Sequence, residues 1–224
     1  MPALEIQALT KAYRGPNGTV QPVIDVPSLT LEQGEQMALR GRSGSGKTTL
    51  LHLIAGILRP DGGQIRIAGE DMAGASESAR DRLRGRAIGY VFQTFHLLEA
   101  YSALENVLLA MHFGAGEDPE RARELLARVG LEERLQHRPA QLSVGQRQRV
   151  AVARALANSP ALVLADEPTG NLDPANASDA LRLIREICSE TGAALLLVSH
   201  DASVLAAFER CEELEALNAA AGGR

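Results

Sequence analysis

One glycine-rich octapeptide limits the possible folds of this chain more than any other segment. It is GRSGSGKT, residues 41–48, which follows an apolar run at residues 36–40 and opens an apolar segment, TTLLHLIAGI, at residues 48–57. A G-x-x-x-x-G-K-[ST] pattern between a buried strand and a helix is typical of a phosphate-binding loop, because its glycines allow backbone N–H groups to turn inward. We expect Lys47 to reach the terminal phosphates of a ligand and the Thr48 hydroxyl to bind magnesium.

The segments around this loop predict an α/β fold. Short apolar runs separated by turn residues before residue 36 indicate antiparallel strands. Continuous apolar runs separated by helical segments indicate a parallel sheet covered on both faces. The later predicted strands lie at residues 36–40, 64–69, 87–93, 161–168 and 193–201, and helices flank them at residues 48–57 and 174–190. A short helical segment is expected at the C-terminal end.

The chain is expected to form a single domain, residues 1–224, with an inserted helical part. With 224 residues, of which 45% are hydrophobic, it is long enough for one sizeable core. Strand signals are few between residues 94 and 157, where helical periodicity recurs. We therefore predict a nucleotide-binding core with an antiparallel part at residues 1–93 and 158–224, and a helical subdomain at residues 94–157.

Composition argues against several other classes of protein. The formal net charge is -5 with both signs interspersed, so we expect no general nucleic-acid-binding surface. Cys188 and Cys211 lack metal-ligand spacing, which favours reduced thiols in a cytosolic protein. The start, MPALEIQALTKAY, lacks a basic region followed by an apolar core, and runs such as ALLLV at residues 194–198 are too short to cross a bilayer. We expect a chain that is soluble by itself.

An acidic pair ends the apolar run LVLADE. Four apolar residues place Asp166 and Glu167 at the carboxyl end of a predicted strand, where open α/β sheets bind ligands. Such a pair is by itself more often part of a solvated loop. Next to a phosphate loop, Asp166 is suited to holding magnesium through water, and Glu167 to orienting or deprotonating an attacking water.

Two further polar residues end neighbouring predicted strands. His200 follows LLLVS and Gln93 ends IGYVFQ, so both should emerge at the same edge of the sheet as the acidic pair. Either residue alone is a weak indication, since a lone histidine is usually structural. Together they predict contacts with a terminal phosphate or with the attacking water.

The segment QLSVGQRQRVAVARAL, residues 141–156, predicts a helix whose start carries an unusual charge. Ser143 is placed to cap this helix, and Gln146 completes the spacing of a capping box. Arg147 and Arg149 occupy the first turns, where the helix dipole favours anions over cations. We therefore expect an anionic group near this helix start, although the arginines could equally form local salt bridges.

In this order of motifs the chain resembles the nucleotide-binding subunit of ATP-binding cassette (ABC) transporters over nearly its whole length. Besides the phosphate loop, the resemblance rests on short segments that match the family motifs: Tyr13 in KAYRG, Gln93, LSVGQ at residues 142–146, LVLADE at residues 162–167, NLD at residues 171–173, and His200.

The resemblance implies an ATPase that closes as a head-to-tail pair around two Mg-ATP molecules. The implied ATP-binding residues are Tyr13, Gly41, Arg42, Ser43, Gly44, Ser45, Gly46, Lys47, Thr48 and Thr49. The implied Mg2+ ligands are Thr48, Gln93 and, through water, Asp166. The implied catalytic residues are Lys47, Gln93, Glu167 and His200. Ser143, Gly145 and Gln146 would face the ATP of the second copy, and Asp173 would couple the two sites.

Two segments depart from the family pattern. Val144 stands where the family usually has glycine, whereas Gly145 is retained. If Ser143 is the cap, Val144 is the first helical residue, where a β-branched side chain is tolerated and the N–H remains available. The C-terminal segment AAFERCEELEALNAAAGGR also differs from the usual ending of the family.

Within the family, IGYVFQTFHLLEAYSALENV and LADEPTGNLD are similar to the branch that serves lipoprotein-releasing, macrolide-exporting and cell-division-linked permeases. This implies a cytoplasmic subunit at the inner face of the cell membrane, bound to an integral-membrane FtsX/MacB-like permease and to no nucleic acid. Its cycle would drive export of lipoprotein, lipid or hydrophobic drug, or mechanotransmission. One alternative is a regulatory cassette that activates an extracytoplasmic enzyme through its permease. Another is a soluble cassette in DNA repair or translation, which the single cassette, the absence of a long heptad insertion and the absence of a basic patch disfavour.

Overall fold

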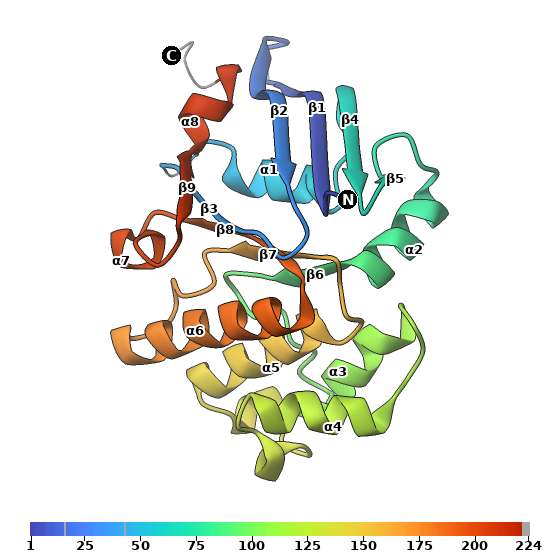
Figure 1. Ribbon diagram of the computed structural model, residues 1–224, viewed down its shortest axis with the longest axis vertical. Coiled ribbons are helices and arrows are strands. Elements are labelled where there is room, and N and C mark those ends of the chain that lie inside the picture. The colour runs from blue at the N-terminus through green and yellow to red at the C-terminus, as the bar shows by residue number, and fades with distance from the viewer. Residues whose placement is uncertain (16, 43, 221–224) are drawn as a thin grey trace.

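The protein is described by a computed structural model covering residues 1–15, 17–42 and 44–220, in which two sheets are stacked with helices between and below them (Figure 1). The strands are β1 (Leu4–Arg14), β2 (Val20–Leu31), β3 (Gln36–Arg40), β4 (Gly62–Ile67), β5 (Glu70–Asp71), β6 (Ile88–Val91), β7 (Leu162–Asp166), β8 (Ala194–Ser199) and β9 (Arg210–Glu213). The helices are α1 (Lys47–Ile54), α2 (Glu77–Ala87), α3 (Ala103–His112), α4 (Pro119–Arg128), α5 (Val144–Leu156), α6 (Pro174–Thr191), α7 (Ala202–Leu205) and α8 (Leu214–Leu217), with 3-10 turns η1 (Glu132–Arg134) and η2 (Pro139–Gln141).

The central sheet is parallel throughout, in the order β6-β7-β8-β3-β9. Every residue of β7 and β8 is buried, because continuous apolar strands such as LVLAD and ALLLVS need cover on both faces. The predicted parallel sheet is therefore confirmed, and β3 has the predicted bounds.

The second sheet is antiparallel, in the order β2-β1-β4-β5. Alternate residues of its long strands are buried, such as Leu4 and Ile6 in β1 and Ile65 and Ile67 in β4. This period of two leaves the other face to solvent, as in antiparallel sheets that cover a core on one side. The predicted N-terminal antiparallel part is confirmed.

Successive residues of the central strands divide the apolar interior into two cores. Leu162 and Leu164 of β7 face the antiparallel sheet and α1, whereas Val163 and Ala165 face the helices below. Helix α1 contacts both β2 and β7, which places the segment after the glycine-rich loop between the two sheets (Figure 1). The loop is thus held at the edge where the two sheets meet.

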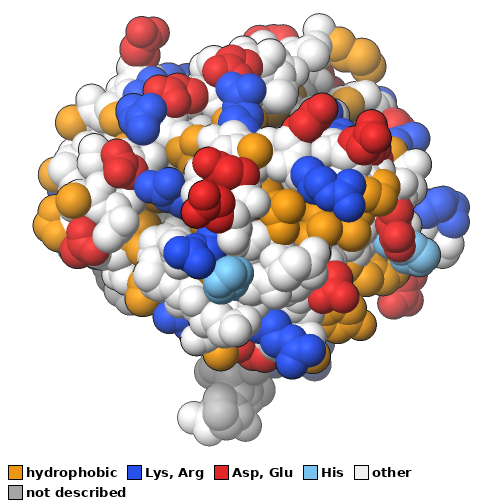
Figure 2. Space-filling model, turned by 90° about the horizontal axis from the view of Figure 1, so that it is seen from below, with side chains coloured by type: hydrophobic (Ala, Val, Ile, Leu, Met, Phe, Trp, Pro, Cys, Tyr) orange, Lys and Arg blue, Asp and Glu red, His pale blue; other side chains and the backbone are white. Residues whose placement is uncertain are grey.

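Helices α3, α4 and α5 pack below the central sheet together with α6 (Figure 1). Their buried residues belong to one continuous core with the lower face of that sheet. Seen from this end of the molecule, the surface carries interspersed charges of both signs, and hydrophobic side chains gather toward one side (Figure 2). The helical segment lies where the sequence predicts it, and its division into a separate subdomain remains a prediction.

Five predicted elements, α1, β4, β6, β7 and β8, end two or three residues earlier in the structure than expected, and the ends of α1 and β6 affect the site. Helix α1 ends at Ile54 rather than at residue 57, because Gly56 turns to a φ of +66° and packs so tightly that a Cβ there would lie 2.5 Å from the sulfur of Met72. Strand β6 ends at Val91, so Gln93 lies in the following loop, where its carbonyl accepts a hydrogen bond from Asn171 Nδ2 at 2.8 Å.

The C-terminal segment is not only helical, as the sequence suggested, but contains the parallel edge strand β9 between α7 and α8. Its sequence, RCEE, has no apolar run, so no strand signal was visible. Arg210 pairs with Glu35, just before β3, at 2.7 Å, which ties the strand to its neighbour, and it also pairs with Glu212 within β9 at 2.8 Å. Helix α2, capped by Ser76, was also not predicted. Within the described residues, no helix combines the length and the apolar character needed to span a membrane.

Candidate functional site

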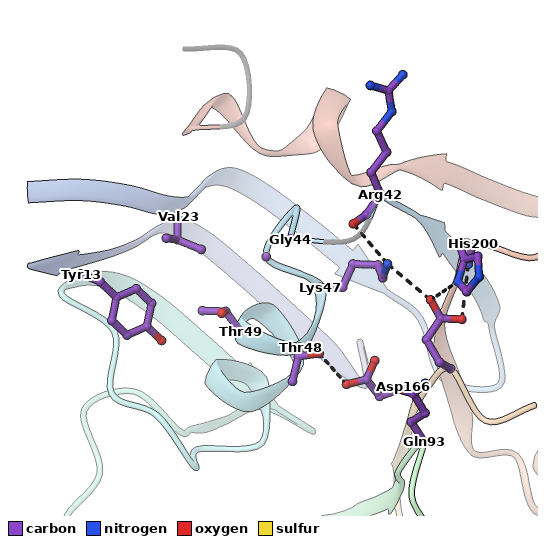
Figure 3. A pocket seen from close by; sticks show the side chains of 12 residues that line it. Tyr13, Val23, Arg42, Gly44, Lys47, Thr48, Thr49, Gln93, Asp166 and His200 are labelled. Carbon is purple, nitrogen blue, oxygen red and sulfur yellow. Dashed lines mark hydrogen bonds and ion pairs between the residues drawn. The ribbon is translucent and has the colours of Figure 1, made fainter. Parts of the chain in front are cut away.

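A cavity of about 670 Å³ opens between the glycine-rich loop, the carboxyl ends of the central strands and the edge of the antiparallel sheet (Figure 3). Residues from segments far apart in the sequence meet there. The lining residues are Tyr13, Val23, Arg42, Gly44, Gly46, Lys47, Thr48, Thr49, Gln93, Asp166, Glu167 and His200.

The glycine-rich loop owes its shape to backbone conformations that favour glycine. Gly44 and Gly46 have φ values of +79° and +97°, and a Cβ on Gly46 would lie 3.2 Å from the Val23 carbonyl oxygen. Gly46 caps α1 without a side-chain hydrogen bond, and the first turn of that helix contains no acidic residue. The start of α1 therefore favours an anion in the cavity.

Thr48 and Asp166 form the pair of oxygen donors on the floor of the cavity. The Thr48 hydroxyl donates a hydrogen bond of 2.8 Å to Asp166 Oδ2. Burial raises the pKa of Asp166, the bond from Thr48 acts in the opposite direction, and the neighbouring Glu167 charge adds to the increase. A hydroxyl beside a carboxylate, with the amide of Gln93 lining the same cavity, suits a hard divalent cation such as Mg2+.

Glu167 is the first residue beyond β7 and is held in a left-handed conformation with a φ of +45°. Its Oε1 lies 2.7 Å from His200 Nδ1 and 3.3 Å from Lys47 Nζ. Its Oε2 accepts a hydrogen bond of 3.1 Å from the fully buried Ser199 hydroxyl. Two segments that are distant from it in sequence, one at Lys47 and one at Ser199–His200, thus orient this carboxylate.

Lys47 folds back over its own loop. Its ammonium donates to the carbonyl oxygens of Gly41 at 2.7 Å and Arg42 at 3.3 Å, besides its ion pair with Glu167. The cavity therefore contains a positive charge whose partners are groups that a polyphosphate would replace.

Tyr13 and Val23 form the opposite wall, on neighbouring strands of the antiparallel sheet (Figure 3). The Tyr13 side chain is 43% exposed, which leaves its ring accessible to a planar ligand. Sequence reasoning missed Val23, although the alternating pattern of β2 would have indicated one apolar face there.

The structure brings most of the predicted ATP-binding and catalytic residues into this cavity, apart from three residues of the glycine-rich loop. Gly41 and Ser45 do not line it but lie against each other, since a Cβ on Gly41 would be 2.6 Å from Ser45 Oγ. Ser43 lies outside the described residues. Ser199 was missed because a serine before a strand-end histidine carries no distinctive signal.

The predicted signature residues do not line this cavity but start α5. Ser143 and Gln146 form the predicted capping box, with hydrogen bonds of 3.2 and 2.9 Å, and Val144 is the first helical residue as expected. A Cβ on Gly145 would lie 2.8 Å from Asn176 Oδ1, so glycine permits close packing against the start of α6. Within the described part of the chain, the amides of Val144 and Gly145 have no hydrogen-bond partner.

The two arginines after the signature have partners within the chain. Arg149 donates a hydrogen bond of 3.2 Å to the Val129 carbonyl at the end of α4 and lies 3.9 Å from Asp179. The guanidinium of Arg147 lies 5.5 Å from the centre of the Phe95 ring. These contacts support the alternative in which the two arginines interact locally. Their positive charges still add to the positive electrostatic potential at the helix start.

Asp173 caps α6 rather than pointing into the cavity. Its carboxylate accepts hydrogen bonds from Asn176 N at 3.1 Å and Asn176 Nδ2 at 2.5 Å. These bonds from the Asn176 side chain and backbone lower the pKa of Asp173. Asp173 therefore has a capping role, and its coupling of two copies remains a prediction.

Comparison with known proteins identifies similar chains. The sequence matches the family profile described as "ABC transporter" over residues 24–170. It is 46% identical over 216 residues to "Lipoprotein-releasing system ATP-binding protein LolD" of Chromohalobacter salexigens, covering 95% of this chain and 90% of the relative. A protein of the same name from Ruegeria sp. is 48% identical over 217 residues, 95% of each chain. The ATP-binding cassette MJ0796, solved as a dimer in a post-hydrolysis state bound to ADP and Pi, superposes with a TM-score of 0.85 at 34% identity, covering 94% of this chain and 93% of that one.

Proposed function

The chain belongs to the ABC transporter family and is an ATPase, and from this premise we propose that it is the ATP-hydrolysing subunit of a lipoprotein-releasing complex. The observation that carries the catalytic part is the cavity in which Lys47, Asp166, Glu167 and His200 converge beside the glycine-rich loop. The names of relatives that are 46% and 48% identical over almost the whole chain support the lipoprotein-releasing part.

ATP is proposed to bind with its triphosphate along the loop and its adenine at the Tyr13 wall. The loop amides and the start of α1 favour the phosphates, and Lys47 exchanges its carbonyl and Glu167 partners for the terminal phosphates. The accessible Tyr13 ring, with Val23 beside it, offers an apolar surface for stacking. The cavity thus has a cationic end that suits the triphosphate and an apolar end that suits the adenine.

Thr48, Asp166 and Gln93 are proposed to hold Mg2+. The metal would supply charge neutralisation between the phosphate oxygens. Asp166 is buried beside Glu167, and the negative charges of the two carboxylates repel each other. A cation at Thr48 and Asp166 would offset this repulsion.

Hydrolysis is proposed to use Glu167 as the base. Once Lys47 turns to the phosphates, Oε1 is available to accept the proton of a water whose oxygen attacks the terminal phosphorus. The bond from this phosphorus to the bridging oxygen breaks, and ADP leaves with that oxygen. Oε2 stays on Ser199, which keeps Oε1 directed into the cavity. His200, with its side chain 70% exposed, is free to turn from Glu167 to the terminal phosphate.

A second copy of the chain is proposed to complete each site. The Val144 and Gly145 amides at the start of α5 are suited to binding an anion, but they do not line the nucleotide cavity of their own chain. In a head-to-tail dimer, Ser143, Gly145 and Gln146 would approach the terminal phosphate held by the partner, with Asp173 next to them. The dimeric state of MJ0796 supports this arrangement.

The permease is proposed to dock into a groove of about 580 Å³ beside β6 and α3. Exposed apolar side chains at its rim, Phe113 at 68% and Ile57 at 47%, suit an apolar helix. His96 lines this groove and Gln93, three residues earlier, lines the nucleotide cavity, so a permease bound in the groove would lie close to the nucleotide. This contact would hold the chain at the inner face of the membrane.

The test is ATP-dependent release of a lipoprotein from proteoliposomes that contain a lipoprotein-releasing permease and this chain. We expect release with the wild type and none with Lys47→Ala, whereas Phe113→Glu should hydrolyse ATP in solution but fail to bind the permease. Stimulated ATP hydrolysis without release would instead favour the regulatory alternative. Normal ATP binding by Lys47→Ala would contradict the assignment of the nucleotide site itself.

A further inference from the structure

The last described helix, α8, links the antiparallel sheet to the glycine-rich loop. Leu214 is fully buried in the upper core and anchors the helix after β9. Asn218, which follows α8, is also fully buried although it is polar. Burial of an amide is unfavourable unless its donor and acceptor are both satisfied, so its partners indicate what it is for.

Asn218 pairs with the free edge of β2 as a neighbouring strand would. Its Oδ1 accepts a hydrogen bond of 2.7 Å from the Asp25 N–H, and its Nδ2 donates one of 2.8 Å to the Val23 carbonyl. Strand β2 is the outermost strand of its sheet, so these backbone groups have no strand partner on that side. The Val23 side chain meanwhile lines the nucleotide cavity.

Glu215, one turn before Asn218, holds the other side of the cavity. Its Oε1 accepts a hydrogen bond of 3.1 Å from the Arg42 N–H in the glycine-rich loop. This backbone bond lowers the pKa of Glu215, so the carboxylate is charged when it holds the loop. Glu215 and Asn218, three residues apart, are therefore hydrogen-bonded to opposite walls of the nucleotide cavity.

We infer that residues 214–218, here called the C-terminal clip, set the distance between the Tyr13–Val23 wall and the glycine-rich loop, and so the fit of ATP as a whole nucleotide. The inference rests on the proposed orientation of ATP. Asn218 and Glu215 are positioning residues, since neither lines the cavity and each acts through a residue that does. The clip lies in the segment that departs from the family's usual ending.

The test compares ATP with inorganic tripolyphosphate, which fills the phosphate loop but has no base to reach the Tyr13–Val23 wall. Asn218→Asp keeps the acceptor for Asp25 and loses the donor to Val23. We expect isothermal titration in the presence of Mg2+ to show ATP affinity weakened about tenfold, equivalent to ~1.4 kcal/mol. Tripolyphosphate affinity should stay within twofold of the wild type. If Asn218→Asp only lowered the overall stability of the protein, the affinities for ATP and for tripolyphosphate would fall together.

Glu215 is tested with a pair of variants because it contributes both an acceptor and a charge. Glu215→Gln keeps the acceptor and removes the charge, whereas Glu215→Ala removes both. We expect the alanine variant to bind ATP and tripolyphosphate about threefold or more weakly than the glutamine variant, since the loop itself is released. This pair also keeps the inference testable if Asn218→Asp fails to fold.

Glu213→Gln is the matched control, because it removes an exposed carboxylate next to the clip whose ion pair, among the described residues, is with Arg40 at 3.2 Å. It should bind both ligands as the wild type does. The inference about the clip would be overturned if a folded Asn218→Asp variant lost affinity for ATP and for tripolyphosphate equally, or lost affinity for neither. Unchanged ATP binding by Lys47→Ala would instead overturn the proposed nucleotide site, so the two failures are distinguishable.

Discussion

At the scale of single residues, the site depends on how one carboxylate is oriented. Glu167 has a left-handed φ of +45°, a conformation that is unfavourable for a residue with a Cβ. Hydrogen bonds from Ser199 and His200 and the ion pair with Lys47 compensate for this strain. Because the partners of Oε1 are polar groups that a phosphate would attract, only the bonds to Oε2 are expected to persist with ATP bound: the one from the Ser199 hydroxyl and a longer one of 3.4 Å from the His200 N–H.

Ser199→Ala should therefore lower kcat more than it changes KM for ATP. We expect a decrease in kcat of about tenfold, which corresponds to ~1.4 kcal/mol of activation free energy, because Glu167 loses the bond that fixes its rotation. Steady-state ATPase assays measure both parameters. Ser199→Thr restores the hydroxyl and should recover most of the rate, whereas a proportional loss in both variants would assign Ser199 to packing alone.

Val144→Gly should keep ATPase activity within a few-fold of the wild type. The Val144 side chain is 40% exposed at the first position of α5, and its backbone N–H is available with either residue. The change should cost some helix stability through backbone entropy. Complete loss of ATPase activity in an otherwise folded protein would show that this helix start is used differently.

At the scale of elements, the start of α5 combines capping with the proposed contact to a second copy. The capping box at Ser143 and Gln146 has a counterpart at the start of α3, formed by Ser102 and Glu105, with hydrogen bonds of 3.2 and 2.7 Å. The two boxes stabilise their helices in the same way. Only the one on α5 belongs to the proposed signature, so the pair can separate stability from function.

Ser143→Ala and Ser102→Ala should each lower the free energy of unfolding by about 1 kcal/mol, the usual cost of losing an N-terminal cap. Urea denaturation without nucleotide measures this loss. Only Ser143→Ala should also lower the ATPase rate beyond what reduced stability explains. Equal ATPase rates in the two variants would contradict a role of the Ser143 hydroxyl in the completed site.

The junction of β9 with the rest of the sheet makes part of the stability depend on pH. Burial tends to raise the pKa of Glu35, but the bonds from Arg210 and the Glu32 N–H outweigh it and lower the pKa below its ordinary value of 4.5. A lowered folded-state pKa contributes stability above the unfolded pKa, which is lost as pH falls through the folded pKa.

Glu35→Gln should therefore be less stable than the wild type at neutral pH, and the difference should shrink as pH falls below 4.5. Urea unfolding of both proteins across this range gives the comparison. Because the pair is partly exposed, we expect a difference of no more than about 1 kcal/mol. A difference that is constant with pH would show that the Glu35 charge contributes nothing.

At the scale of the whole molecule, the two sheets place the base-binding wall and the catalytic groups on opposite sides of one cavity. Tyr13 and Val23 come from the antiparallel sheet, whereas Asp166 and Glu167 come from the end of the central sheet. The start of α5 lies outside this cavity. One molecule therefore presents an ATP site that lacks the proposed signature contacts, and a second copy is expected to provide them.

Glu167→Gln should trap that pair. The variant keeps the hydrogen-bonding shape of the side chain but cannot accept a proton, so we expect normal ATP binding, at least about 100-fold slower hydrolysis and an ATP-dependent dimer. Size-exclusion chromatography with light scattering, with and without Mg-ATP, measures the dimer. Undiminished turnover would remove Glu167 from its proposed role, and a monomer with ATP bound would contradict the completed site.

Much of the fold could be predicted because local patterns agree with the tertiary structure. The apolar runs of β3, β7 and β8 and the capping box of α5 are decided by near neighbours in the sequence. Strand β9 and helix α2 were missed because neither has an apolar pattern of its own. The ion pair of Arg210 with Glu35 and the pairing with β3 hold β9 in place, and these contacts join residues far apart in the chain.

The sequence by itself determined the chemistry of the site: the phosphate loop, the Asp166–Glu167 pair at a strand end, and the polar residues after neighbouring strands. These are local signals, because a motif needs only its own residues and the strand or helix beside it. Only the tertiary structure decided that Ser199 orients Glu167, that Val23 joins Tyr13, and that Asn218 and Glu215 fasten the two walls. Each of these depends on side chains meeting across elements, and that geometry is set by how the two sheets pack around α1 rather than by any short stretch of sequence.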